Sequence, residues 1–203
     1  MVNEVNSVND NPVIDIKSKT VYHGGNFHGD YVSFEMDKLK IAITKMSILA
    51  ERQINFMMNH KLNEILPPFV NLGVLGLNLG LQGTQFTAVS TVAENQTLAN
   101  PMYVHSISNN NDNQDVVSMG TNAALMTKKV IENTFEVLAV EYLCMIQAVD
   151  YLKIQDKMAS ATKNIYDKLR TIVPVFVEDI PKYDELKKIK NFLLAHNPEI
   201  INK

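Results

Sequence analysis

The residues of this sequence that are best suited to chemistry are amides, carboxyls and imidazoles gathered in three short clusters. They are Asn9-Asp10-Asn11-Pro12, then His23-Gly24-Gly25-Asn26-Phe27-His28-Gly29, then residues 109–115 followed by Ser118-Met119-Gly120. Amide side chains both donate and accept hydrogen bonds, so they suit the polar end of a small substrate. The glycines of the second cluster allow a tightly folded loop from which an aromatic ring can project.

Each cluster also has a purely structural interpretation. Asn and Asp side chains bond to nearby backbone in turns, and Pro12 fixes φ at its position. The third cluster is also typical of a capped turn before a helix, with Asp115 or Ser118 near the N-cap. His23 and His28 lie five residues apart without a further ligand cluster, so no metal is expected. Taken singly, the clusters leave both interpretations open.

The overall composition narrows the class of protein. The 22 acidic and 19 basic residues give a formal net charge of -3 and are scattered along the chain, so no nucleic-acid partner is expected. The single cysteine, Cys144, cannot form an internal disulfide, and residues 1–11 show no secretory signal, which together favour the cytoplasm. P-loop, GxGxxG, HExxH, paired-cysteine and GxSxG motifs do not occur in the 203 residues.

An uncharged stretch over residues 65–93 contains no Asp, Glu, Lys or Arg and raises the question of a membrane span. The same stretch holds two prolines, four glycines and several amides, which a lipid-exposed helix tolerates poorly. We expect instead a helix that protein encloses on every side, and no membrane association. In a chain this short, such burial requires other subunits or a further part of the fold.

Long helices are predicted around the clusters, because apolar residues recur at steps of three and four. In residues 31–60 these are Leu39, Ile43, Met46, Ala50, Ile54 and Met57, with Lys38, Lys40, Lys45, Glu51 and Arg52 on other faces. In residues 118–152 they are Ile131, Phe135, Leu138, Tyr142, Met145, Val149 and Leu152, spaced as in the seam of a helix bundle.

The remaining elements complete an all-α fold. An uncharged helix is expected over residues 76–98 and shorter helices over residues 156–171 and 181–195, while residues 3–29 are expected to be loops around one small strand at most. We therefore predict a long-helix bundle in a single helical domain over residues 1–203. It comprises a loop-rich site segment (1–30), a core of long helices (31–155) and short C-terminal helices (156–203).

In this order, the clusters resemble the C-terminal half of the aromatic amino acid ammonia-lyases, which act on histidine, phenylalanine and tyrosine. The resemblance covers roughly residues 1–155. The clusters that carry it are Asn6-Ser7-Val8-Asn9-Asp10-Asn11-Pro12, the second cluster, Asn113-Gln114-Asp115 and Ser118-Met119-Gly120. Three further segments also agree with the family: Ala50-Glu51-Arg52, Leu66-Pro67-Pro68-Phe69 and Leu138-Ala139-Val140-Glu141. It implies that the fold is similar to the central helical domain of that family.

The resemblance also implies a role for each candidate site residue. In the family, a methylidene-imidazolone made from an internal Ala-Ser-Gly is the electrophile, a tyrosine removes the β-proton and ammonia leaves. Asn11 would lie near the substrate carboxylate, Phe27 would pack on the substrate ring and the electrophile, and Asn113 and Gln114 would line the pocket near the amine. The family forms homotetramers in which three subunits build each site, and this would account for the uncharged helix.

The sequence departs from the family in one decisive respect. No Ala-Ser-Gly occurs in the 203 residues, and the tyrosine loop and carboxylate-binding arginine of the family's N-terminal half have no counterpart. We therefore expect a chain that holds no cofactor of its own and is inactive alone, since a site without its central group retains little of its rate.

Two interpretations remain open. The chain is either a truncated or separately encoded portion that an N-terminal lyase half completes, or a non-catalytic remnant that forms a helical oligomer. Gln114 stands where histidine-specific members usually carry glutamate, which favours phenylalanine or tyrosine as the substrate. Release of ammonia and its transfer to the β-carbon, as in related aminomutases, both fit the sequence.

Overall fold

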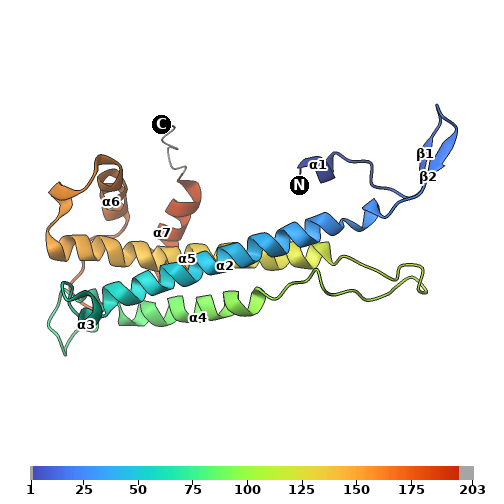
Figure 1. The fold of residues 1–203 in the computed structure, drawn as a ribbon. Coiled ribbons are helices and arrows are strands. Elements are labelled where there is room, and N and C mark those ends of the chain that lie inside the picture. The colour runs from blue at the N-terminus through green and yellow to red at the C-terminus, as the bar shows by residue number, and fades with distance from the viewer. Residues whose placement is uncertain (1, 197–203) are drawn as a thin grey trace. The chain divides into compact units, whose positions relative to one another are not determined.

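The computed structural model describes residues 2–196 and confirms the all-α class (Figure 1). Two long helices, α2 (Asp30–Met58) and α5 (Gly120–Leu152), accompany the shorter α4 (Gln82–Leu98). The other helices are α1 (Val2–Val5), α3 (His60–Asn63), α6 (Ser160–Ile172) and α7 (Tyr183–Ala195), with 3-10 helices η1 (Asn26–His28), η2 (Pro68–Val70) and η3 (Gln155–Lys157).

The chain divides into two compact units, and both long helices contribute to each. Unit 1 comprises Met1–Thr44 and Gln96–Ile131, and unit 2 comprises Lys45–Asn95 and Glu132–Lys203. All three polar clusters belong to unit 1. The shorter C-terminal helices α6 and α7 belong to unit 2.

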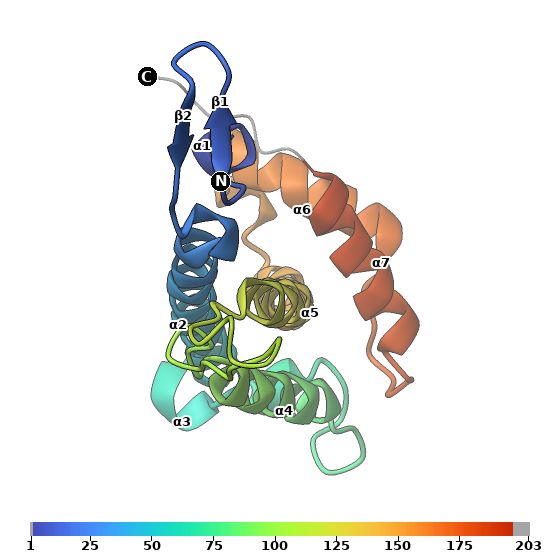
Figure 2. The ribbon, with the colours of Figure 1, turned by 90° about the vertical axis from the view of Figure 1, so that its right-hand side faces the viewer.

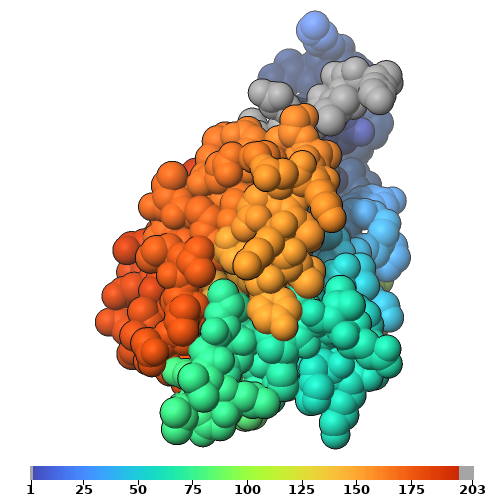
Figure 3. Space-filling view, turned by 90° about the vertical axis from the view of Figure 1, so that its left-hand side faces the viewer, coloured from blue at the N-terminus to red at the C-terminus, as the bar shows by residue number. Residues whose placement is uncertain are grey.

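Unit 2 is built around an apolar core to which α2, α4, α5, α6 and α7 all contribute (Figures 1 and 2). Ile54, Leu81, Leu143, Leu169 and Ile189 are completely buried there. In Figure 3 the C-terminal helices, orange to red, lie against the segment around η2, teal to green. Removal of these apolar side chains from water is the main force that holds unit 2 together.

Unit 1 contains a short β-hairpin in which β1 (Val13–Asp15) pairs antiparallel with β2 (Thr20–Tyr22). The prediction of one strand at most is therefore wrong. The second strand, β2, pairs with β1 because a tight turn joins the two strands. The Asp15 carboxylate accepts hydrogen bonds from the Lys17 backbone N–H (2.9 Å) and the Ser18 hydroxyl (2.7 Å), which closes the turn.

Helix α2 buries a different face in its first half from the one predicted. Leu39 and Met46, which belong to the predicted apolar face, are 41% and 62% exposed. The buried residues of this half are instead polar and recur at heptad spacing: Ser33, Asp37, Lys40, Thr44 and Ser47. The predicted face turns into the core only from Ala50 onward. Apolar periodicity identifies the most apolar face of a helix but not which face the chain itself covers.

Helix α5 shows the same difference. The predicted seam, from Ile131 to Leu152, is half-buried. The heptad positions that the chain does bury lie one residue earlier, at Val130, Thr134, Val137, Glu141, Cys144 and Ala148. The predicted seam is therefore not the face that α5 covers most completely within this chain.

The helix predicted over residues 76–98, which contains Glu94 and so is not wholly uncharged, begins at Gln82 and not at residue 76, because residues 71–80 are held in a loop. The Asn71 side-chain N–H donates to the Asn78 carbonyl (2.8 Å), and the Asp179 carboxylate accepts the backbone N–H of Gly80 (3.0 Å). Gly80 has φ of +59°, and a Cβ there would lie 2.9 Å from Asn71 atoms. A helix cannot run through such a residue.

Helix α4 is not enclosed by the described part of this chain. It buries Thr84, Ala88 and Val92, yet leaves Phe86 69% and Val89 45% exposed. Among the described helices, none combines the length and apolar character needed to cross a membrane.

Candidate active site

The four predicted site residues all lie in irregular parts of unit 1. Asn11 precedes the β-hairpin, Phe27 lies in η1, and Asn113 and Gln114 lie in the loop between α4 and α5. The side chains of the first three are exposed and that of Gln114 is half-buried. All four side chains are thus at least partly accessible to solvent.

Asn11 joins the first polar cluster to the second. Its side-chain oxygen accepts the backbone N–H of Gly24 (3.1 Å), thirteen residues later in the chain. Its own backbone N–H donates to the Asp10 carboxylate (2.8 Å). The amide is therefore fixed at both its side chain and its backbone.

Phe27 is presented by a tight turn that leads directly into α2. The turn ends at Gly29, whose left-handed conformation (φ +62°) favours glycine and whose N–H donates to the Asn26 carbonyl (3.2 Å). The Phe27 ring lies 4.2 Å from the His28 ring between centroids and is 41% exposed. The aromatic ring is therefore partly accessible to a partner.

The third cluster forms a turn, as its structural interpretation predicts. Asn109 and Gln114 exchange two backbone hydrogen bonds (3.0 and 3.3 Å) across a tip at which Asn110, Asn111 and Asp112 have positive φ. Asn and Asp tolerate that conformation better than most residues. The turn interpretation does not exclude a binding role, because the Gln114 side-chain amide makes no hydrogen bond within the described residues.

The start of the loop that carries Asn113 and Gln114 is anchored by a buried ion pair. Lys40 is completely buried, lies 2.7 Å from the Asp37 carboxylate and donates to the Asn100 carbonyl (2.8 Å). The Tyr103 backbone N–H donates to Asp37 (2.7 Å). Burial raises the pKa of Asp37, but hydrogen bonds from Lys40 and from backbone N–H groups outweigh it, so this pKa lies below its ordinary value of 3.8.

The apolar pattern of the sequence did not reveal this ion pair, since it placed Lys40 and Glu51 on faces other than the apolar one. Both residues are buried. The only signal was the spacing of Asp37 and Lys40, three residues apart on one face of the helix.

The end of the same loop is tied to the Phe27 turn. The Ser118 hydroxyl donates to the His28 carbonyl, and α5 begins two residues later at Gly120. Of the two residues predicted near the N-cap, Asp115 and Ser118, Ser118 lies two residues before the first helical residue, but its hydroxyl binds a different segment and not the N–H groups of the helix. A hollow of about 430 Å³ adjoins this contact and is lined by His28, Gly29, Val32 and residues 117–122.

The structure thus brings the three clusters into one region of unit 1. Asn11 binds the second cluster, and Ser118 binds the end of the Phe27 turn. The lining of the adjoining hollow does not include Asn11, Phe27, Asn113 or Gln114. The four predicted residues therefore do not complete a closed pocket by themselves.

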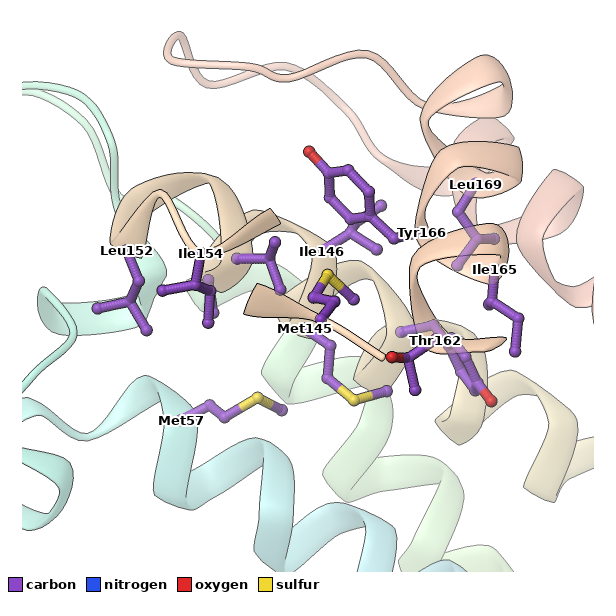
Figure 4. Close-up of a pocket in the computed structure, with 13 residues that line it drawn as sticks. Met57, Met145, Ile146, Leu152, Ile154, Thr162, Ile165, Tyr166 and Leu169 are labelled. Atoms are coloured by element: carbon purple, nitrogen blue, oxygen red, sulfur yellow. The ribbon is translucent and has the colours of Figure 1, made fainter. Parts of the chain in front are cut away.

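A second hollow, in unit 2, is chemically different (Figure 4). It measures about 330 Å³ and is lined almost entirely by apolar side chains, among them Met57, Met145 and Leu152.

Two buried groups of α5 have raised pKa values. Burial raises the pKa of Glu141. Burial, and to a smaller extent the charge of Glu141, raises the pKa of the Cys144 thiol far above its ordinary range. The thiol therefore stays protonated, and the described residues contain no grouping of three or more His, Cys, Asp or Glu side chains suited to a metal.

Comparison with known proteins identifies the family to which the chain belongs. A family model described as aromatic amino acid lyase matches residues 1–171. The chain is 42% identical over 190 residues to the MIO-dependent tyrosine 2,3-aminomutase of Streptomyces globisporus, covering 94% of this chain and 35% of that protein. It is 41% identical over 199 residues to histidine ammonia-lyase of Bacillus subtilis (strain 168), covering 95% and 39%.

A solved structure agrees in fold. The chain superimposes on the phenylalanine aminomutase of Pantoea agglomerans with a TM-score of 0.91 and 41% identity, covering 98% of this chain and 38% of that one. The chain therefore spans between about a third and two fifths of the length of these relatives. With residues 1–171 matched and these identities, the chain belongs to the aromatic amino acid lyase family.

Proposed function

We propose that this chain forms the substrate-positioning part of an aromatic amino acid ammonia-lyase or 2,3-aminomutase, and that it is active only together with a polypeptide that carries Ala-Ser-Gly. The observation that supports this most is the arrangement of unit 1. Its site segments are tied to one another by Asn11–Gly24 and Ser118–His28, while the Phe27 ring and the Gln114 amide remain accessible. The segments are fixed and their side chains are open to a ligand.

The residues would act by positioning. The Asn11 amide would hold the substrate carboxylate, the Phe27 ring would pack on the substrate ring, and Asn113 and Gln114 would bind near the amine. A neutral amide at position 114 favours an apolar ring over imidazole, because an amide is less costly to desolvate than a carboxylate. Phenylalanine or tyrosine is accordingly the substrate that we propose.

The methylidene-imidazolone of the family supplies the electrophile that labilises the amino group of the substrate. The 203 residues contain no Ala-Ser-Gly from which to form it. In this chain the Phe27 ring would contact the methylidene-imidazolone. The ring is 41% exposed and can pack on a planar heterocycle from another polypeptide. The chain's own residues would exclude water and orient the substrate around it.

Other subunits would cover the apolar surface that the chain leaves open. On α2 this surface includes Met46 and Leu49, and on α4 it includes Phe86, each about 60% exposed or more. Single exposed apolar residues are ordinary, but apolar positions recurring at helical spacing are typical of a face that another helix covers. We propose that this covering occurs in a homotetramer, as in the family.

A 2,3-aminomutase is the second candidate. The tyrosine and phenylalanine aminomutases are as similar to this chain as the histidine ammonia-lyase is. The two activities differ in whether ammonia leaves or returns to the β-carbon. Their products, an acrylate and a β-amino acid, are readily distinguished.

The test is complementation. The chain is purified alone and together with the Ala-Ser-Gly-bearing portion of the Streptomyces aminomutase that this chain does not cover, and each preparation is given phenylalanine, tyrosine and histidine. We expect cinnamate, coumarate or the corresponding β-amino acids only from the mixture. The bacterial portion alone and a mixture with its Ala-Ser-Gly serine replaced by alanine are the controls. No product from any mixture would instead support the non-catalytic oligomer.

A further inference from the structure

We propose that Ser118 is a positioning residue that holds the Phe27 ring at the substrate. This inference rests on the proposed function and names the group that fixes the position of the Phe27 ring in the proposed site. Ser118 is 6% exposed, and its hydroxyl donates to the His28 carbonyl across 90 residues of sequence. A directional bond between segments so distant in sequence fixes their relative position.

The bond acts at the residue next to Phe27. In η1 the His28 N–H donates to the Gly25 carbonyl (3.1 Å) and the Gly29 N–H to the Asn26 carbonyl (3.2 Å). The His28 carbonyl lies at the end of this short helix, where carbonyl groups lack a partner within the helix. The Ser118 hydroxyl supplies that partner. Because the two rings pack together, a shift of His28 would carry Phe27 with it.

Ser118 also connects Phe27 to the loop that carries Gln114. Next to it, the Val117 backbone N–H donates to the Ser106 hydroxyl (2.9 Å), across the base of that loop. The Ser106 hydroxyl in turn donates to the Asp115 carbonyl (3.4 Å). The Ser118–His28 bond therefore links the turn that carries Phe27 to the base of the loop that carries Gln114.

A purely structural tether is the competing explanation, and the chain offers a matched control for it. Thr127 is 1% exposed, and its hydroxyl proton is shared between the Ala123 carbonyl one helical turn earlier (2.7 Å) and the Met36 carbonyl (2.9 Å), which is 91 residues away. Like Ser118, it belongs to unit 1 and binds a distant backbone carbonyl. It lies on the α5 helix, away from Phe27 in sequence and about two turns beyond the helix start. Thr127→Val removes both bonds and keeps the shape of the side chain.

The first measurement uses the absence of tryptophan from the sequence. Phe27→Trp gives the full 203-residue chain a single indole at the position of interest. In this background, we expect Ser118→Ala to shift the indole emission to the red and to increase its quenching by acrylamide. Ser118→Thr retains the donor, and the adjoining hollow has room for its methyl group, so it should leave both signals unchanged. Thr127→Val should also leave them unchanged.

The second measurement needs no reporter. Amide hydrogen exchange of residues 26–33 should be roughly fivefold faster in Ser118→Ala, since the lost bond favours local opening of the turn. It should be unchanged in Thr127→Val, although both variants lower the melting temperature. If Ser118→Ala does not fold, Ser118→Cys replaces it, because sulfur is a weaker donor of similar size.

The proposal is overturned if Ser118→Ala leaves the indole signals and the exchange of residues 26–33 unchanged, or if Thr127→Val alters them equally. Neither readout requires turnover. An inactive complementation mixture would therefore count against the proposed function without bearing on the role of Ser118 in placing the ring.

Discussion

The two units of this chain bury different kinds of side chain. In unit 2, leucine, isoleucine and valine side chains fill the core, and buried polar residues such as Gln147 are set among them. In unit 1, Ala123 and Val130 are the only apolar residues that are buried among the described ones. The others are polar: Ser33, Asp37, Lys40, Thr44, Ser118 and Thr127.

This difference corresponds to what each unit has to hold. Apolar burial is strong but has no direction, so it suits the packing of helices. Hydrogen bonds and ion pairs have a defined geometry, so they suit loops whose side chains must face a substrate. In the proposed function unit 1 carries such loops, whereas unit 2 contains the apolar core.

The largest effect is expected from Lys40→Met in unit 1. It leaves the Asp37 carboxylate buried without its cation and frees the Asn100 carbonyl, at a cost of about 3–5 kcal/mol. Denaturant unfolding measures the loss, and hydrogen exchange should show it first in unit 1. The double variant Asp37→Leu, Lys40→Met should be milder, because no charge then remains buried. Equal destabilisation by the single and double variants would contradict the importance of the pairing.

In unit 2, Leu143→Ala is the corresponding change. Leu143 is completely buried, and truncation should destabilise the chain by about 2–5 kcal/mol through lost burial and the cavity that remains. The control is Leu77→Ala, since Leu77 is 81% exposed and its loss should change stability by less than about 0.5 kcal/mol. The comparison would fail if the exposed and buried leucines behaved alike in equilibrium unfolding.

A substitution at position 114 tests whether unit 1 selects the substrate. In the complemented enzyme, Gln114→Glu should raise kcat/KM for histidine relative to tyrosine by about tenfold, because a carboxylate suits imidazole better than an apolar ring. Gln53→Glu, on an exposed position of α2, is the matched control and should leave the ratio unchanged. An unaltered ratio in Gln114→Glu would remove this residue from the substrate site.

The remaining effects concern pH and have opposite signs in the two units. The pKa of Glu141 is raised by burial, so the native state binds its proton more readily than the unfolded chain does. Glu141→Gln should therefore stabilise unit 2 by about 1 kcal/mol at neutral pH, and this gain should disappear as the pH falls to about the ordinary value of 4.5.

Asp37 in unit 1 behaves oppositely. Its lowered pKa gives stability that is fully present above the ordinary value of 3.8 and is lost as the pH falls below it. Asp37→Asn should thus destabilise the chain at neutral pH, and the difference from the parent chain should shrink only under strongly acidic conditions. Unfolding measured across pH 2 to 7 with all three proteins checks both signs.

Much of the fold could be predicted from the sequence, because heptad spacing specifies long helices. The α2 helix was predicted over residues 31–60 and runs from Asp30 to Met58. The sequence could not show which face each helix buries. In the part of α2 that belongs to unit 1, the apolar Leu39 is exposed and the charged Lys40 is buried, because most of the side chains that unit 1 buries are polar.

The four candidate site residues stay predictions, and the contacts that connect their segments could not be predicted from the sequence. Asn11, Phe27, Asn113 and Gln114 were identified from their clusters and from the family resemblance. In the hydrogen bonds between Asn11 and Gly24 and between Ser118 and His28, one partner is a backbone group. Because almost every residue has such groups, the pattern of side chains in the sequence does not predict these contacts.

The central claim, that unit 1 positions the substrate while unit 2 only supports it, is tested most directly by kcat/KM in the complemented enzyme. We predict that Phe27→Leu and Asn11→Ala each lower kcat/KM by roughly a hundredfold, since misplacement of a substrate is enough for such a loss. Met145→Leu, in the apolar hollow of unit 2, should retain kcat/KM within about twofold, because it conserves volume. Full activity in both unit 1 variants, or a comparable loss in Met145→Leu, would contradict the account.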